Sequence, residues 1–135
     1  MTNAVFLDSG IFIAFLNRRD QWHPQAVMLF DHRPSRWHTS FLVVSETYSW
    51  FLHRMGEEAA RHFNEFLNSL EKLELLEITA GHHQAVLKML DRFHGSKLTY
   101  VDASSLYFID HHKISKIWST DYHLSLMGAE VLPRR

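Results

Sequence analysis

The stretch AVFLDSGIFIAFL, residues 4–16, decides the fold of this chain. Residues 4–7 are apolar and include Val and Phe, which favour a buried strand, and the run ends at Asp8. From Ile11 to Leu16 apolar residues recur at helical spacing, so we expect a helix directly after the acid. A strand, a carboxylate and a helix in this order form the first unit of an α/β fold.

The same alternation continues along the rest of the chain. Further strands are predicted at 36–40, 73–78, 117–118 and 129–132, and helices at 24–30, 41–53, 57–70, 80–93 and 101–113. Because parallel strands need crossover connections, this pattern predicts one domain, residues 1–135, with a parallel sheet of about five strands and helices on both faces. Ligands of such sheets gather beyond the carboxyl ends of the strands, where Asp8 and Asp121 fall.

Composition narrows the class of protein. The chain contains no cysteine, which removes disulfides, zinc–thiolate sites and cysteine nucleophiles. No apolar run approaches the roughly 18 to 20 residues of a membrane span, and the first residues do not resemble a secretion signal, so we expect a cytoplasmic protein without a membrane partner. The formal net charge of -1 gives weak steering toward a polyanion, so any nucleic acid would contact a local patch.

Four carboxylates stand in or directly behind apolar stretches. They are Asp8, Glu46, Asp102 and Asp121. A carboxylate moved out of water without a partner costs several kcal/mol or takes up a proton. Glu46 is the sharpest case, since it is the only charged residue between Phe41 and Leu52. A divalent cation shared by the four acids explains all four placements together.

Each acid also has a structural explanation, which the sequence leaves open. Asp8, Asp102 and Asp121 stand at predicted helix starts, where a carboxylate that caps free amides contributes about 0.5 to 2 kcal/mol. Glu46 can instead pair with a nearby arginine or lie on an exposed seam of its helix.

Oxygen ligands without cysteine suit Mg²⁺ or Mn²⁺, ions that keep several waters and bridge to substrate phosphates. A phosphodiester is therefore the natural substrate. Metal-assisted hydrolysis of a phosphodiester requires no protein nucleophile, and nothing in the chain resembles one.

Five groups of residues carry a resemblance to a known family. They are Val5–Gly10; Asp20, His23 and Ala26; Thr39–Ser40 with Ser45–Thr47; Leu98–Asp102 with Ser105; and Ser119–His123 with Gly128–Glu130 before Pro133. In this order and spacing, over essentially the whole chain, the sequence resembles the PIN-domain ribonucleases. Within them it is similar to the small stand-alone members of the VapC toxin type.

The resemblance implies an α/β/α sandwich and Mg²⁺- or Mn²⁺-dependent cleavage of single-stranded RNA. The implied catalytic and metal-binding quartet is Asp8, Glu46, Asp102 and Asp121. Ser105 and Thr120 would support the quartet, Ser105 by hydrogen bonding. Many relatives have Ser or Asn where this chain has Gly10, so a supporting hydrogen bond is in doubt there. For a toxin the resemblance also implies an antitoxin protein and a homodimer, which a single chain cannot identify.

Four basic residues flank the segments that carry the acids. The candidates for an RNA path are Arg18, Arg19, Arg54 and Lys97. Phosphates need countercharge near the acids, so the positions of these residues suit RNA binding. The adjacent histidine pairs, His82 with His83 and His111 with His112, are expected at the surface.

Two other classes of function compete with the nuclease. A non-catalytic RNA- or protein-binding module with a PIN-like fold would use the acids as caps, and its binding would resist chelators. A receiver-like phosphotransfer domain would need a second acid beside Asp8 and a lysine after a late strand. This chain has Ser9 and Pro133 at those places.

Overall fold

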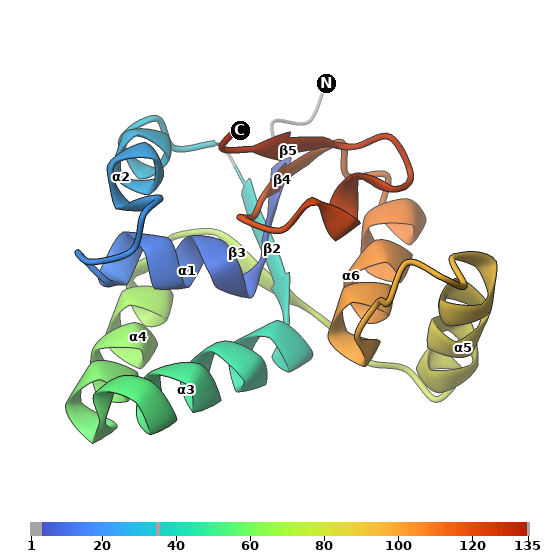
Figure 1. Cartoon of the computed structure of the whole chain (residues 1–135), viewed down its shortest axis with the longest axis horizontal. Helices are drawn as coiled ribbons and strands as arrows, with labels where there is room; N and C mark the ends of the chain where they lie inside the picture. Colours follow the sequence, from blue (N-terminus) through green and yellow to red (C-terminus); the bar gives the residue numbers. More distant parts are fainter. Residues whose placement is uncertain (1–3, 35, 135) are drawn as a thin grey trace.

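A computed structural model describes residues 4–34 and 36–134, which build one parallel sheet between two groups of helices (Figure 1). The strands are β1 (Ala4–Leu7), β2 (Arg36–Ser40), β3 (Leu73–Leu76), β4 (Lys116–Trp118) and β5 (Glu130–Leu132). The helices are α1 (Ser9–Leu16), α2 (His23–Asp31), α3 (Phe41–Met55), α4 (Glu57–Ser69), α5 (His82–Arg92) and α6 (Tyr100–His111), with a 3₁₀ turn η1 (Tyr122–Ser125). The predicted α/β/α architecture is confirmed.

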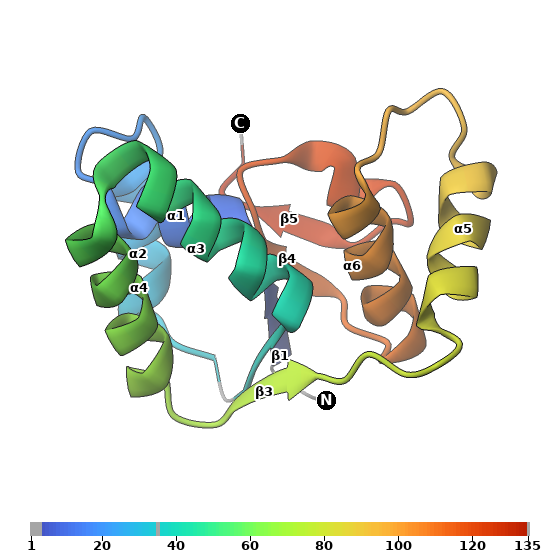
Figure 2. The same cartoon turned by 90° about the horizontal axis from the view of Figure 1, so that it is seen from below.

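The order of the strands places the end of β1 at a special point of the sheet. The order is β3-β2-β1-β4-β5, with every neighbouring pair parallel. The chain first grows outward from β1 to β3, then crosses over and adds β4 on the other side of β1. Helices α1 to α4 therefore cover one face, and α5 and α6 cover the other (Figures 1 and 2). Such a reversal between neighbouring strands leaves a crevice at their carboxyl ends, where ligands bind in open α/β sheets.

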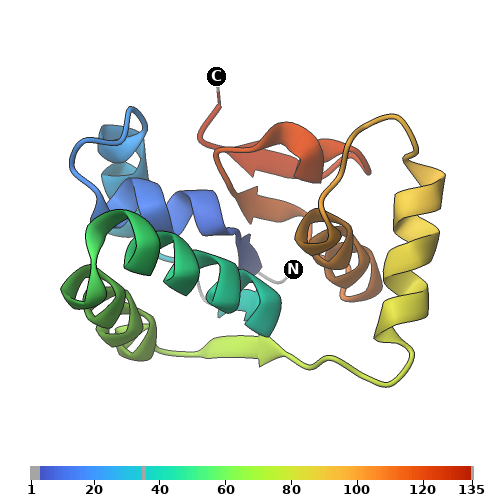
Figure 3. The same cartoon turned by 60° about the horizontal axis from the view of Figure 1, so that its bottom comes forward.

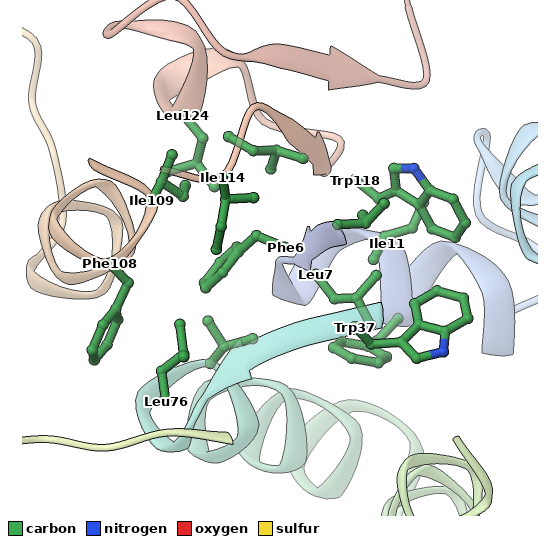
Figure 4. Packing of buried hydrophobic residues seen from close by; sticks show 14 of the residues in the cluster. Phe6, Leu7, Ile11, Trp37, Leu76, Phe108, Ile109, Ile114, Trp118 and Leu124 are labelled. Carbon is green, nitrogen blue, oxygen red and sulfur yellow. The ribbon is translucent and has the colours of Figure 1, made fainter. Parts of the chain in front are cut away.

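Strand β1 is buried on both of its faces, which explains its unbroken apolar run. Phe6 points toward Phe108 of α6, and Leu7 points the other way, toward Ile11 and Trp37 (Figure 4). Phe6, Leu7 and Ile11 are fully buried. Burying a side chain of this size contributes about 1.5 to 3 kcal/mol relative to exposure, so the stretch that opens the fold also anchors both halves of the core.

Aromatic rings fill the space between the sheet and α1, α2 and α4. The rings of Trp37 and Trp118 meet edge to face at 5.3 Å, and Phe30 of α2 contacts both at 5.5 and 5.1 Å. Phe12 of α1 meets Phe63 of α4 at 5.3 Å. Such pairs contribute about 0.5 to 1.5 kcal/mol beyond the burial of their area, so this cluster fixes the layer of helices that carries α1.

The second layer of helices corrects one expectation from the sequence. His82 was expected at the surface, but it is 2% exposed because α5 packs along α6 (Figure 3). Its Nε2 lies 2.7 Å from Ser104 Oγ, and its ring stacks on Phe108 at 4.8 Å. Burial lowers the pKa of His82, so the neutral ring belongs to the core.

Strand β3 also ends two residues earlier than the predicted 73–78. Its last paired residue is Leu76, opposite Ser40 at the end of β2. Ser40 then caps α3 by accepting a hydrogen bond from the Val43 amide at 3.2 Å. Because β2 stops there, Glu77 and Ile78 have no neighbouring strand to pair with. Within residues 4–34 and 36–134, no helix has the length and apolar character needed to cross a bilayer.

Candidate metal centre

Asp8 occupies the carboxyl end of β1, at the switch point between β1 and β4. Its backbone amide donates to the Trp118 carbonyl at 3.1 Å, which continues the pairing of the two strands. Asp8 is the N-cap residue of α1, yet its side chain forms no capping hydrogen bond. Instead, Asp8 Oδ2 accepts a hydrogen bond of 2.7 Å from the hydroxyl of Ser119, the residue after β4. The capping explanation is therefore wrong for this acid.

The Asp8 carboxyl is 4% exposed, and this burial shifts its titration. The pKa of Asp8 is raised from its ordinary 3.8 to about 7, mainly by burial and to a smaller extent by the negative charges of Asp102 and Glu46. Hydrogen bonds from the Ser119 hydroxyl and the Ser9 backbone oppose the shift. An ionised Asp8 is thus unfavourable in the metal-free protein, and Asp102 and Glu46 lie close enough to add to its cost.

Asp102 and Asp121 serve as caps, as one explanation from the sequence proposed. Asp102 Oδ2 accepts from the Thr99 amide at 3.1 Å, while Thr99 Oγ1 accepts from the Asp102 amide at 3.0 Å, which completes a capping box at the start of α6. Asp121 Oδ1 accepts from the His123 amide at 2.9 Å and caps η1. These bonds fix the orientation of both carboxylates.

The imidazole of His123 stands between these two acids. Its Nδ1 lies 3.4 Å from Asp102 Oδ2 and 3.2 Å from Asp121 Oδ1. The carboxylates and the imidazole therefore form one cluster, although Asp102 comes from α6 and Asp121 follows β4.

Glu46 reaches the same end of the sheet from α3. Its Oε1 accepts a hydrogen bond of 2.7 Å from the hydroxyl of Ser9, the first residue of α1. Glu46 is exposed and forms no ion pair with an arginine in the described parts of the chain. Of the explanations left open for Glu46, the structure favours an exposed position held toward Asp8 by Ser9.

A serine to which the sequence assigned no role links the two sides of the site. Ser119 is 1% exposed, and its Oγ accepts from the Asp121 amide at 3.0 Å while it donates to Asp8. Ser105, which the resemblance implies as a support, is fully buried, and its Oγ has no hydrogen-bond partner among residues 4–34 and 36–134. Ser9, Ser119 and His123 lie in stretches that carry the resemblance, but sequence reasoning gave none of them a role in the site.

Gly10 lies in close contact with Thr120, the residue that follows Ser119. A Cβ atom built on Gly10 would lie 2.2 Å from Thr120 Oγ1, 3.2 Å from the Thr120 amide nitrogen and 3.3 Å from its Cβ. The first turn of α1 thus packs against the segment that follows β4 with no room for a side chain. Gly10 allows this close approach.

The basic candidates lie at the surface, and none pairs with an acid in the described parts of the chain. Arg18 and Arg19 follow the last residue of α1, whose eight residues span about 12 Å from the Asp8 end. Arg54 lies near the end of α3 with its guanidinium 5.5 Å from the centre of the Trp50 ring. Lys97 precedes α6 and, of the four, lies nearest along the chain to one of Asp8, Glu46, Asp102 and Asp121.

The cluster of acids fits a divalent cation. One donor atom each from Asp102, Asp121 and His123 lies within 4.8 Å of the other two. His123 Nδ1 is buried and makes no hydrogen bond within the described chain, so a donor atom faces the acids without a partner of its own. Asp8 adds a carboxylate whose raised pKa a nearby cation would lower. Asp102, Asp121 and His123 supply the atoms that can hold the ion. Within the described chain Asp8 and Glu46 do not belong to this group of three, although the charges of Asp102 and Glu46 both act on Asp8.

A parallel sheet flanked by helices, with acids gathered at its switch point, defines an α/β/α protein with a candidate metal centre. The profile of the PIN domain matches residues 5–130. The chain therefore belongs to the PIN domain family. No curated protein sequence matches the chain.

Solved structures of low sequence identity share this fold. VapC20 of Mycobacterium tuberculosis, described as a sarcin-ricin loop cleaving toxin, is 24% identical with a TM-score of 0.84, and the match covers 93% of this chain and 95% of that one. A toxin–antitoxin complex from Klebsiella pneumoniae matches at 13% identity and a TM-score of 0.68, covering 95% of each chain. FitAcB from Neisseria gonorrhoeae matches at 12% identity and a TM-score of 0.66, covering 94% and 95%.

The contact between Gly10 and Thr120 predicts an unusual effect on stability. Ala is the better helix former by about 0.5 to 1 kcal/mol, yet Gly10→Ala should destabilise the protein by roughly 1 to 3 kcal/mol because its Cβ meets Thr120. Adding Thr120→Ala should recover part of the loss. Urea unfolding measures both. As a control, Gly81→Ala has open space around it and should change stability by less than about 0.5 kcal/mol. A Gly10→Ala protein as stable as the wild type would contradict the close packing.

Asp8 predicts a pH dependence of stability in the metal-free protein. Because its pKa is raised on folding, the folded state binds the extra proton, so stability falls as the pH rises from about 4 through 7. The slope from this group reaches about 1.4 kcal/mol per pH unit. With a chelator present, the difference in free energy of unfolding between Asp8→Asn and the wild type should therefore shift in favour of Asp8→Asn as the pH rises across this window. Urea unfolding at each pH measures the difference. The exposed Asp91→Asn control should follow the wild type, and a parallel Asp8→Asn curve would refute the shift.

Proposed function

We propose that this protein is a metal-dependent endoribonuclease that cleaves phosphodiester bonds of single-stranded RNA by water attack. The observation that carries the proposal is the convergence of Asp8, Glu46, Asp102 and Asp121 at the switch point of the sheet, linked through Ser9, Ser119 and His123. Membership of the PIN domain family supports a nuclease. An RNA substrate would place the activity in the cytoplasm.

In this proposal the carboxylates of Asp102 and Asp121 would hold Mg²⁺ or Mn²⁺, with orientations set by the Thr99 and His123 amides. Such an ion would supply activation of water for in-line attack and stabilisation of charge on the departing 3′ oxygen. Asp8 and Glu46 complete the acidic set. Ser119 keeps Asp8 directed toward the site, and Ser9 does the same for Glu46. The products would carry 5′ phosphate and 3′ hydroxyl ends.

RNA as the substrate class is supported by the description of VapC20 as a sarcin-ricin loop cleaving toxin. The net charge of -1 leaves RNA to be gathered by a local set of cations rather than by the whole surface. Lys97 is the strongest of the basic candidates, because it precedes the helix that carries Asp102. Arg18, Arg19 and Arg54 would contact phosphates further from the cleavage point.

Two single-charge variants test the nuclease directly. Asp8→Asn and Asp102→Asn each remove one negative charge, and in the second variant the amide oxygen can still accept from the Thr99 amide that shapes the helix start. Each should lower the rate of cleavage at least about a hundredfold, since even residues that only support metal ligands commonly cost 10- to 100-fold. Single-stranded RNA with Mg²⁺ or Mn²⁺ is the substrate, and Asp91→Asn, exposed on α5, is the matched control.

Equal cleavage by Asp8→Asn and the wild type would refute the proposal. RNA binding that chelators leave unchanged, without turnover under either ion, would instead identify a non-catalytic binding module. In the first case the cleavage would come from a contaminating nuclease and not from this site. In the second case the protein would bind RNA without catalysing its cleavage.

We further propose that the protein acts as the toxin of a toxin–antitoxin pair, with the antitoxin as its partner. One solved structure of the same fold is described as a toxin–antitoxin complex, and another, VapC20, as a toxin. On α3 the apolar side chains of Phe41, Tyr48 and Met55 are 52%, 36% and 47% exposed. Their spacing of seven residues puts them on one face of the helix. A partner that covers this stripe would bury apolar surface now in water.

The product of a neighbouring gene, co-expressed with this protein, tests the partnership. It should co-purify with the wild type and abolish RNA cleavage. Met55→Lys should weaken the complex at least about tenfold, since a buried unpaired charge costs more than 1.4 kcal/mol, while cleavage by the free variant stays unchanged. Glu58→Lys, exposed one turn beyond, controls for added charge. If these residues of α3 instead join two copies of this chain, the protein should form a dimer that Met55→Lys dissociates. That result would contradict the proposal that the antitoxin covers this face.

A further inference from the structure

The imidazole of His123 is placed as a ligand would be, rather than as a surface side chain. Its Nδ1 faces Asp102 Oδ2 at 3.4 Å and Asp121 Oδ1 at 3.2 Å. The atom is buried and makes no hydrogen bond in the described chain, although the side chain as a whole is 39% exposed. The ring therefore directs a nitrogen into the acidic cluster and leaves its other edge toward solvent.

The distances match the geometry of one coordination sphere. In an octahedral complex with bonds of about 2.1 Å, adjacent donor atoms stand about 3.0 Å apart. The separations from His123 Nδ1 to the two carboxylate oxygens exceed this by only a few tenths of an ångström. Each oxygen accepts one amide hydrogen bond, and a carboxylate oxygen keeps a second lone pair for a cation. A single ion can thus contact all three residues with small movements.

The fold holds His123 in this position at three points. Its amide donates to Asp121 Oδ1, and the residue belongs to the 3₁₀ turn η1. The next residue, Leu124, is fully buried and points into the core near Ile109 of α6 (Figure 4). Because η1 packs against the helix that carries Asp102, the position of the imidazole is fixed relative to this carboxylate.

A nitrogen donor changes which ions the site prefers. Mg²⁺ binds oxygen ligands almost exclusively, whereas first-row transition ions accept imidazole readily. We propose that His123 is a ligand of the cation and biases the centre toward first-row transition ions such as Mn²⁺ over Mg²⁺. The inference rests on the proposed metal-dependent nuclease and specifies its cofactor. His123 joins the carboxylates as a second kind of donor, and the quartet implied by the resemblance becomes part of a mixed oxygen and nitrogen set.

The competing role for His123 is that of a counter-charge between two acids. In that case a cation would replace the imidazole, and removing the ring would strengthen binding of Mn²⁺ and Mg²⁺ alike. A ligand predicts the opposite, because losing it weakens Mn²⁺ binding selectively. The two roles therefore differ in the sign of the effect.

Calorimetric titration of the metal-free protein with MnCl₂ and MgCl₂ separates them. His123→Ala keeps the backbone amide that donates to Asp121 Oδ1 at the start of η1. It should bind Mn²⁺ about tenfold more weakly, with Mg²⁺ affinity changed by less than about threefold. His94→Ala removes an exposed histidine from the segment after α5 and should bind both ions as the wild type does. Circular dichroism checks that each variant is folded.

Pulsed electron paramagnetic resonance of bound Mn²⁺ gives a second readout, which reports on the ligand directly. The wild type should show the nitrogen coupling of one directly bound imidazole, and His123→Ala should lack it. Bound Mn²⁺ without nitrogen coupling in the wild type, or tighter binding of both ions by His123→Ala, would overturn the inference and leave the nuclease intact. A wild type that binds neither ion would refute both the inference and the metal-dependent nuclease.

Discussion

Asp8 is kept out of water between β1 and β4, where Asp102 and Glu46 add negative charge and hydrogen bonds from the Ser119 hydroxyl and the Ser9 backbone compensate only in part. This arrangement is costly for the metal-free protein, since burial alone opposes ionisation of the carboxyl. A fold that only needed stability would place an uncharged residue there. The rest of the candidate site follows from this constraint, because each neighbouring element contributes either another donor or a group that orients one.

The two explanations that the sequence left open for these acids are compatible in the structure. Asp102 closes a capping box, and Asp121 caps η1, yet both present oxygens to His123. Capping therefore serves the site, because a carboxylate fixed by a backbone amide loses the freedom that a cation would otherwise have to restrict. Each of these two acids stands where a helix or turn begins. The strands of the sheet bring the beginnings of α6 and η1 close together.

Local patterns in the sequence predicted the sheet and the edge at which the acids gather. The run from Ala4 to Leu7 predicted a doubly buried strand, and alternation of strands and helices predicted parallel pairing. What could not be predicted depends on contacts between distant segments. The residues around Ser119 give no sign that its hydroxyl will donate to Asp8, which lies 111 residues away in the chain. His123 resembles any of eleven histidines until η1 is docked on α6, and the reason for Gly10 is visible only once Thr120 lies against α1. The burial of His82 likewise required the packing of α5 on α6.

The hydrogen bond from Ser119 to Asp8 joins residues made at very different times on the ribosome. Asp8 and Glu46 emerge early, whereas Ser119, Asp121 and His123 emerge only after the long crossover through α5 and α6. Contacts of such large sequence separation form late, because the chain must first close the loop between them. A nascent chain therefore carries acids but no assembled cluster, and a cell that makes this protein is not exposed to a finished centre until the second half of the sheet has folded.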